Sequence, residues 1–244
     1  MRRMAIALSK GGVGKTTTAV NLAHGLSRRG RRVLLVDMDT QGQASFALGV
    51  RPEKGLAEAM SGEKAQEVVE EARENLFLLS GGRRLAEISM AISRRQLGVE
   101  RALMETLNPI EKEFDFVLMD MAPGWDLLSV NALFFADEVL CPVSLEIAAV
   151  QGLVEFIARL EDVKKYKPDL TLRHVVPTFM DRRLKRTGEI LGQLEDLFPE
   201  ILRSPIRLDV RLSECFGHGE TIFEYAPDSK GAEDYEALIE EVNK

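Results

Sequence analysis

A glycine-rich loop between a predicted strand and a predicted helix constrains this chain more than any other part of its sequence. The loop reads Ser9-Lys10-Gly11-Gly12-Val13-Gly14-Lys15-Thr16-Thr17, after the apolar run Met4–Leu8 and before a helical pattern through Leu26. Glycines let successive backbone N–H groups point into one concavity, and the positive end of the helix dipole favours an anion there. We expect Lys15 to reach the β- and γ-phosphates of a nucleoside triphosphate and the Thr16 hydroxyl to ligate Mg²⁺.

The loop departs at one position from the pattern Gly-x-x-x-x-Gly-Lys-[Ser/Thr], because Ser9 replaces the first glycine. The alternative interpretation is a chance glycine turn before a helix. The preceding strand, the following helix and the Gly14-Lys15-Thr16 ending favour the nucleotide site. The predicted nucleotide-binding residues of this loop are Lys10, Gly11, Gly12, Val13, Gly14, Lys15, Thr16 and Thr17.

The second lysine of the loop, Lys10, discriminates further between the possible functions. Lys10 and Lys15 lie so close on one loop that they cannot easily both contact the same terminal phosphate. One physical solution is that Lys10 projects outward onto the nucleotide of a second subunit. The alternative interpretation is a solvated lysine in a turn.

Length and composition are those of one large α/β domain covering residues 1–244. The chain is 45% hydrophobic and 29% charged, which is ordinary for a soluble globular protein. The start Met1-Arg2-Arg3 leads directly into a predicted strand, and no apolar stretch is long enough to span a membrane, so we expect a cytoplasmic protein. Cys141 and Cys215 lack metal-ligand spacing and are expected to be reduced thiols.

Apolar runs alternate with helical patterns along the whole chain, and two of the runs end in carboxylates. The strand-like run from Arg32 ends in Asp37-Met38-Asp39, and the run from Phe114 ends in Asp120, followed by Met121-Ala122-Pro123-Gly124. The alternation predicts a single doubly wound, mostly parallel sheet with helices on both faces, of the P-loop NTPase type. Parallel strands collect such residues at the edge that binds ligands. Candidate ligands of Mg²⁺ at this edge are Thr16, Asp39 and Asp120, and the sequence alone does not assign which carboxylate lies at the metal and which orients the attacking water.

The remaining predicted elements complete this pattern. Further strands are expected at 75–79, 138–143 and 172–179, and a last, less regular one at 201–208. Helices are expected at 85–107 with an interruption near Gly98, after the 138–143 strand, at 184–197 and at 232–242.

The segment Lys10-Gly11-Gly12-Val13-Gly14-Lys15-Thr16-Thr17 resembles the deviant Walker A motif of the ParA/MinD superfamily, whose members form ATP-sandwich dimers. The resemblance covers nearly the whole chain. Near the C-terminus, Val210-Arg211-Leu212-Ser213-Glu214 and Tyr225-Ala226-Pro227 follow the chromosomal ParA (Soj) pattern. The resemblance implies a weak ATP hydrolase whose activity a partner stimulates.

The resemblance also implies roles for individual residues. The family motif Asp-x-Asp-x-Gln-Gly stands here as Asp37 to Gly42, with Thr40 and Gln43 in place of the usual proline and asparagine. It implies that Lys10, Lys15 and Asp39 are catalytic, with Asp39 positioning the hydrolytic water. Asp37 would stabilise the switch loop and Asp120 would support Mg²⁺. The implied base-binding surface comprises Thr178, Pro205 and Ile206.

A basic cluster provides a candidate DNA-binding surface, although the chain carries a formal net charge of -7. No aromatic interleaving suggests base readout, so the expected ligand is double-stranded DNA bound without sequence preference. The alternative is a solvated face that balances the acidic remainder. The candidate residues are Arg182, Arg183, Lys185, Arg186, Arg203, Arg207 and Arg211.

Three functions remain open at this level. The first is an ATP-dependent homodimer that partitions DNA or positions another cargo, associates with the nucleoid, and releases DNA when a ParB-like partner stimulates hydrolysis. The second is a MinD-like switch on a membrane surface, which the acidic C-terminal segment disfavours. The third is a metabolic enzyme on the same scaffold, for which the sequence offers no additional motif.

Overall fold

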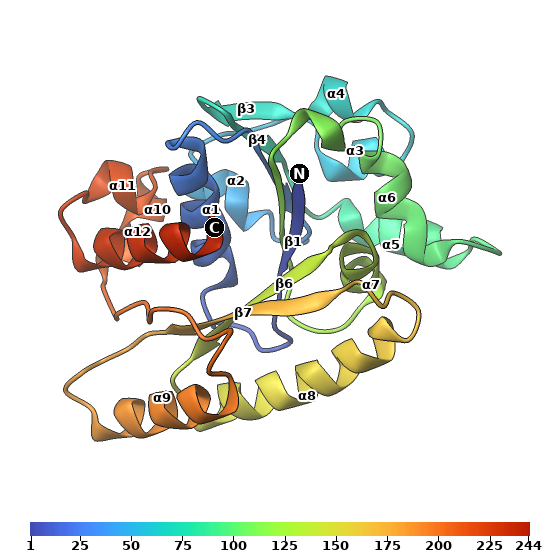
Figure 1. Cartoon of the computed structure of the whole chain (residues 1–244). Coiled ribbons are helices and arrows are strands. Elements are labelled where there is room, and N and C mark those ends of the chain that lie inside the picture. Colours follow the sequence, from blue (N-terminus) through green and yellow to red (C-terminus); the bar gives the residue numbers. More distant parts are fainter.

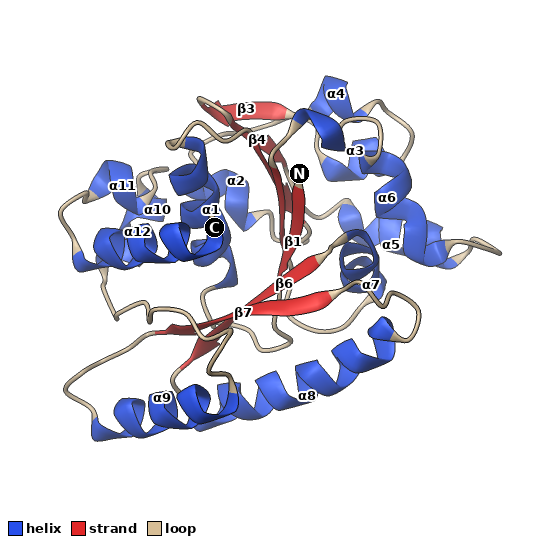
Figure 2. Cartoon of the chain, in the orientation of Figure 1, coloured by secondary structure: helices blue, strands red, loops and turns tan.

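The computed structural model describes residues 1–244 and contains one seven-stranded sheet of order β3-β4-β2-β5-β1-β6-β7 (Figures 1 and 2). Every neighbouring pair is parallel except the edge pair β3 and β4, which is antiparallel. The strands are β1 (Arg2–Ile6), β2 (Val33–Asp37), β3 (Glu70–Arg73), β4 (Leu76–Leu79), β5 (Phe116–Asp120), β6 (Glu138–Ser144) and β7 (Thr171–Thr178). The predicted doubly wound, mostly parallel sheet is confirmed.

Helices cover both faces of the sheet and bury two separate apolar layers against it (Figure 1). On one face, α1 (Lys15–Ser27) packs against α12 (Lys230–Val242). On the other face, α7 (Leu127–Phe135) packs against β1 and α8 (Ile147–Lys164) against β6. The other helices are α2 (Gln43–Ala47), α3 (Leu56–Met60), α4 (Ala65–Val68), α5 (Leu85–Ser93), α6 (Ala102–Leu107), α9 (Lys185–Leu197), α10 (Arg211–Gly217) and α11 (Ile222–Tyr225), with single 3₁₀ turns η1 (Val99–Arg101) and η2 (Glu111–Glu113).

One predicted strand is wrong. Residues 201–208 run beside β7 but pair with it only at two isolated bridges, Val175 with Leu202 and Met180 with Arg207. Pro205 lies between these bridges and has no N–H to donate to a ladder. The segment is therefore an extended connection rather than an eighth strand.

The topology brings the carboxyl ends of β1, β2 and β5 together at one edge of the sheet. β5 lies between β1 and β2, and Asp37 is the direct register partner of Asp120. The loop after β1 leads straight into the N-terminus of α1 at the same edge. This arrangement places the glycine-rich loop and the strand-end carboxylates in one site.

Candidate nucleotide-binding site

The glycine-rich loop is folded as a left-handed turn that leads into α1. Gly12 and Gly14 have φ angles of +72° and +87°, a region that side chains other than glycine's rarely occupy. The Lys15 ammonium donates a hydrogen bond to the Lys10 carbonyl at 2.9 Å, and the Thr178 hydroxyl donates to the Val13 carbonyl at 2.9 Å. The end of β7 therefore fixes the loop from the side opposite the carboxylates.

A cavity of about 340 Å³ opens above this loop. Its floor is the loop itself, and its walls come from the turn after β2, the turn after β5 and the end of α10. Backbone N–H groups at a helix N-terminus suit a chain of phosphates. The lining residues are Gly11, Gly12, Gly14, Lys15, Thr16, Thr17, Asp39, Gln43, Met121, Pro123 and Phe216.

Asp37 is fully buried and holds the turn after β2. Its two carboxylate oxygens accept hydrogen bonds from the backbone N–H groups of Asp39 at 2.9 Å and Ala44 at 3.1 Å. Burial raises the pKa of Asp37 to about 6, and the backbone hydrogen bonds offset part of that rise. Asp37 thus ties the start of α2 to the sheet rather than facing the cavity.

Asp120 differs from Asp37 because its carboxylate has no partner. It is 1% exposed, and neither of its oxygens accepts a hydrogen bond. Burial and the neighbouring Asp37 raise the pKa of Asp120 well above its usual range, while Thr16 and Lys15 act in the opposite direction. A buried polar group without a partner is costly, so such a group at a phosphate cradle points to a cation.

The residues around Asp120 fit Mg²⁺ held together with phosphates. No group of three or more acidic, histidine or cysteine side chains is present that could hold a metal alone. Mg²⁺ commonly binds through one or two carboxylates plus substrate phosphates and water. Thr16 lies next to Asp120, and Asp39 lines the same cavity. Thr16 and Asp120 would hold the ion, which would neutralise charge on the phosphates when bound.

Asp39 sits at the cavity wall in a tightly held turn. Its carboxylate accepts from the Gln41 N–H at 2.9 Å, and its carbonyl accepts from the N–H groups of Gly42 and Gly82. A Cβ at Gly81 would lie 2.5 Å from the Asp39 carbonyl oxygen, so only glycine fits there. The half-buried Asp39 side chain is therefore presented to the cavity by a backbone that has little freedom.

Lys10 does not line this cavity. Its side chain is exposed and makes no ion pair, and its Cβ lies 3.6 Å from where a Cβ would stand on Gly152 of α8. Lys15 is buried instead, and its desolvation lowers its pKa. The two lysines thus occupy different environments on one loop.

A second close backbone contact connects the turn after α2 with the turn after α10. A Cβ on Gly49 would lie 2.9 Å from the Gly219 carbonyl oxygen, and one on Gly219 would lie 2.6 Å from the Gly49 Cα. Both residues have positive φ angles. Gly49 and Gly219 line a neighbouring cavity rather than the nucleotide cavity, but Phe216 of α10 borders both.

The predicted base-binding residues do not all lie on the cavity surface. Thr178 is 3% exposed and its hydroxyl is used by the loop, while Ile206 is 2% exposed and packs in the core under α1. Pro205 belongs to the extended connection beside β7. The sequence did not indicate Gln43, Met121 and Phe216 as lining residues: Gln43 and Met121 adjoin recognised motifs without a role of their own, and Phe216 comes from a segment without a motif.

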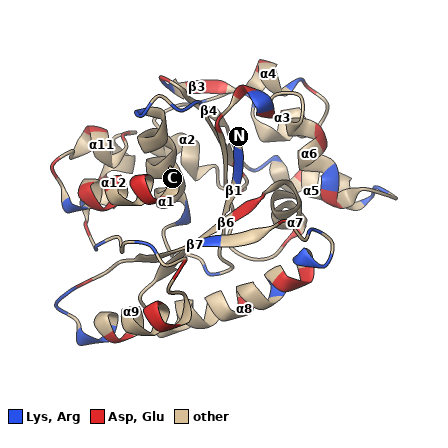
Figure 3. Ribbon diagram, viewed as in Figure 1, with Lys and Arg blue, Asp and Glu red and all other residues tan.

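The predicted basic cluster is divided by the structure. Arg182 and Arg186 lie near the start of α9 and make no ion pair, whereas Arg203 donates to His174 at 2.7 Å. Figure 3 shows this basic segment before α9 apart from the acidic surface of α12. The other four cations have acidic partners: Arg183 with Asp181, Lys185 with Glu189, Arg207 with Glu233 and Asp234, and Arg211 with Asp209.

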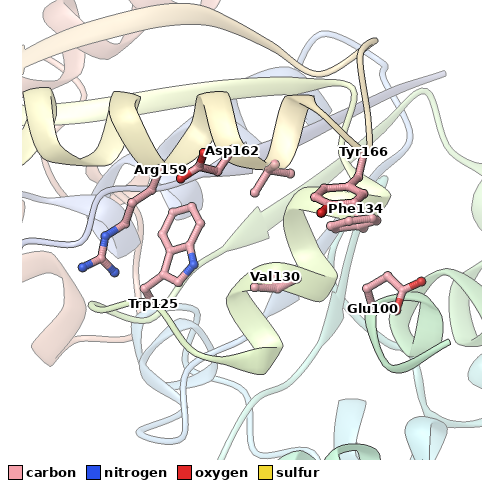
Figure 4. A pocket seen from close by; sticks show the side chains of 8 residues that line it. Glu100, Trp125, Val130, Phe134, Arg159, Asp162 and Tyr166 are labelled. Carbon is pink, nitrogen blue, oxygen red and sulfur yellow. The ribbon is translucent and has the colours of Figure 1, made fainter. Parts of the chain in front are cut away.

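A separate cavity of about 510 Å³ lies between α7, α8 and η1 (Figure 4). Trp125, the single tryptophan of the chain, lines it, with the Arg159 guanidinium 5.7 Å from the ring centroid. The loop before Trp125 reaches the nucleotide site, where the Gly124 N–H donates to the Ser9 carbonyl at 3.0 Å. Trp125 is therefore a natural fluorescent reporter of that loop.

Comparison with known proteins agrees with this site. A family model described as an AAA domain matches residues 1–172. The chromosome-partitioning ATPase Soj of Thermus thermophilus is 39% identical over 99% of this chain and 95% of its own. The crystal structure of cobyrinic acid a,c-diamide synthase from Mycobacterium smegmatis with ATP analogue and magnesium has a TM-score of 0.85 at 30% identity, covering 100% of this chain and 94% of that one.

The cell division ATPase MinD of Pyrococcus furiosus has the same fold, with a TM-score of 0.84 at 27% identity, covering 99% of this chain and 98% of that one. The fold and the site together define a P-loop nucleotide hydrolase. The chain belongs to the ParA/Soj-type ATPases of the ParA/MinD superfamily. It is an ATP hydrolase with ATP and Mg²⁺ as substrate and cofactor. No helix of the chain has the length and apolarity needed to cross a membrane.

Proposed function

We propose that this chain is an ATP-dependent switch that partitions DNA or positions another cargo. ATP joins two copies of the chain, the dimer binds double-stranded DNA without sequence preference, and a ParB-like partner stimulates hydrolysis and release. Differential affinity of the triphosphate for the paired state provides the switch. The observation that carries this proposal is the exposed, unpaired Lys10 on the loop that already contains the buried Lys15.

Exposed apolar side chains on α8 offer a surface for pairing of two copies. Ile147 and Val154 lie two turns apart on α8 and are 63% and 56% exposed. Side chains at this spacing share one face of a helix, whereas Gly152, the α8 residue next to Lys10, lies on a different face. Exposed apolar groups of this kind suit burial against a second copy.

Within each copy, different residues bind the phosphates, hold Mg²⁺ and orient the attacking water. Loop N–H groups and Lys15 bind the phosphates, Thr16 and Asp120 hold Mg²⁺, and Asp39 orients the attacking water. Lys10 adds positive charge to the second copy's site only in the dimer. Charge stabilisation and positioning are the main sources of rate in phosphoryl transfer.

Replacing Lys10 tests the dimer. Lys10→Ala is expected to lose ATP-dependent dimerisation in analytical ultracentrifugation while still binding ATP as a monomer. Lys54→Ala, an exposed lysine paired with Glu63 at 2.7 Å, is the matched control and should dimerise normally. An unchanged ATP dimer in Lys10→Ala would refute the role of Lys10.

Replacing Asp39 tests the positioning of water. Asp39→Ala is expected to hydrolyse ATP about 100-fold more slowly and to remain a long-lived ATP dimer. Brisk turnover in this variant would contradict the assignment.

The DNA-binding proposal concerns mainly the free cations near α9. Binding of a non-specific duplex should be strongest with a nonhydrolysable ATP analogue, weak with ADP, and reduced by salt. Replacing Arg182 and Arg186 with alanine should lower the slope of log K against log salt by about 2. Arg94→Ala, another exposed arginine without an ion pair, should leave the slope unchanged. Equal binding with ADP and with the analogue would contradict a nucleotide-controlled DNA interaction.

The structure offers little support for a switch on a membrane surface. The apolar side of α12, comprising Tyr235, Leu238, Ile239 and Val242, is at most 1% exposed because it packs on the body of the protein. Its outer side carries Glu233, Glu236 and Glu240. An interfacial helix needs a free apolar face and a basic polar face.

A further inference from the structure

Phe179, directly after β7, has the most unusual backbone conformation in the site. Its φ angle is +55°, in the left-handed region where a bulky side chain is a genuine outlier. The residues on either side are fixed, since the Thr178 carbonyl accepts from the Leu145 N–H and the Met180 N–H donates to the Ile206 carbonyl. Strained residues held by their surroundings concentrate at binding and catalytic sites.

The strained backbone places the aromatic ring against the phosphate loop. A Cβ built on Gly14 would lie 3.9 Å from Phe179 Cζ and 4.0 Å from its Cε2, so the ring lies beside the loop with room for about one methyl group between them. The side chain is nevertheless 43% exposed. No other aromatic ring or guanidinium stacks on it, although six arginine–aromatic contacts occur elsewhere in the chain.

The order of the strands determines which part of a nucleotide meets this ring. Asp39 and Asp120 follow β2 and β5, on one side of β1 and its loop. Phe179 follows β7, two strands away on the other side of β1. A triphosphate whose terminal phosphate and Mg²⁺ lie by the carboxylates must direct its ribose and base toward the other flank. Phe179 is the exposed aromatic residue on that flank.

We propose that Phe179 stacks on the nucleobase and positions it in the site. The inference rests on nucleotide binding at the glycine-rich loop and concerns a residue that no motif indicated. Stacking requires no particular base because every base has a π-face, and the larger purine ring system stacks more strongly than a pyrimidine. Phe179 should therefore add affinity for nucleoside triphosphates, purines above pyrimidines, and add none for inorganic tripolyphosphate.

Calorimetric titration with two ligands separates base from phosphate contacts. Phe179→Gly and Phe179→Ala should bind MgATP about tenfold more weakly than the wild-type protein, and magnesium tripolyphosphate with unchanged affinity. Phe179→Tyr retains a ring and should bind MgATP normally. Leu184→Ala, which removes a 48% exposed side chain from the same edge, is the control and should bind both ligands normally.

Two further measurements exclude a merely structural role. Glycine adopts the left-handed conformation without strain, so Phe179→Gly should melt no lower than the wild-type protein in the absence of ligand. The fluorescence of 2-aminopurine riboside triphosphate should be quenched on binding to the wild-type protein and less quenched on binding to Phe179→Gly. The proposal is overturned if the variants bind MgATP normally, or if tripolyphosphate affinity falls as much as MgATP affinity.

Discussion

Buried charges are unpaired at the carboxyl ends of the parallel strands and form ion pairs at their amino ends. At the carboxyl ends, Asp120 is buried without a hydrogen bond, and Lys15 is desolvated beside it. At the amino ends, Arg2 donates to both oxygens of Glu138 at 2.8 and 2.6 Å, and Arg3 donates to both oxygens of Asp137.

The paired arginines also lie over aromatic rings, Arg2 over Phe116 at 5.3 Å and Arg3 over Phe135 at 5.2 Å. Breaking a buried ion pair is costly because it leaves one charge uncompensated. The amino ends therefore use charge to stabilise the fold. The carboxyl ends leave charge uncompensated at the place where phosphates and a cation bind, so that the ligand provides the missing partners.

The largest expected effect comes from removing the unpartnered carboxylate. Asp120→Asn should reduce Mg²⁺-dependent phosphate release about 100-fold, since a supporting ligand of the metal is lost. The ligand-free variant should melt about 2–4 °C higher at pH 8, because a buried charge next to Asp37 is gone. Phosphate release and differential scanning fluorimetry measure the two effects. Normal hydrolysis by Asp120→Asn would show that the unpartnered carboxylate at the carboxyl ends of the strands has no role in hydrolysis.

The second-largest effect is a loss of stability expected at the amino ends of the strands. Glu138→Gln should lower the free energy of unfolding by about 2 kcal/mol, since Arg2 keeps its burial but loses its charge partner. Hydrolysis should remain normal. Urea denaturation measures the change, and Glu161→Gln in the exposed pair with Lys164 is the control with little expected effect. Equal stability of both variants would show that the pairing at the amino ends contributes nothing.

The smallest effect concerns pH. Burial lowers the pKa of His174 from 6.5 to about 3, and the nearby Arg203 and Arg2 act in the same direction. This contribution to stability is fully present above about pH 6.5 and is lost as the pH falls toward 3. Asp37, whose pKa is raised to about 6, contributes with the opposite sign: its contribution is lost as the pH rises through 6.

Comparing His174→Gln with the wild-type protein isolates the histidine, because Asp37 is common to both. Between pH 6.5 and 4.5 the wild-type protein should lose about 1.4 kcal/mol per pH unit more than the variant. Glutamine retains an acceptor for the Arg203 N–H. Denaturation curves across this range test the prediction, and parallel slopes would show that His174 does not titrate as its burial requires.

The sequence predicted the elements and site residues whose structure follows from a local pattern of residues. The run before Ser9, the glycines and Lys15-Thr16 predicted the strand, loop and helix that the structure contains. The carboxylates at the ends of two apolar runs predicted their meeting at one edge, and Asp37 and Asp120 are direct register partners.

Other features depend on contacts that no local pattern records. Residues 201–208 have the composition of a strand, yet Pro205 limits their pairing with β7 to isolated bridges. Arg203 is close in sequence to Arg207 but is held by His174 instead of joining a common basic surface. The left-handed backbone of Phe179 arises from β6 and the 201–208 segment holding its neighbours, so its sequence gave no sign of it.

The contact between Gly49 and Gly219 makes the C-terminal third of the chain sensitive to the state of the nucleotide. With no side chain between the two backbones, there is no deformable layer to absorb a shift of α2. A shift of the turn after α2 is therefore passed to the turn after α10, and α10 contacts α11 and, through Leu212, Gly231 of α12. ATP hydrolysis at the glycine-rich loop can in this way change the position of α11 and α12, which do not contact ATP.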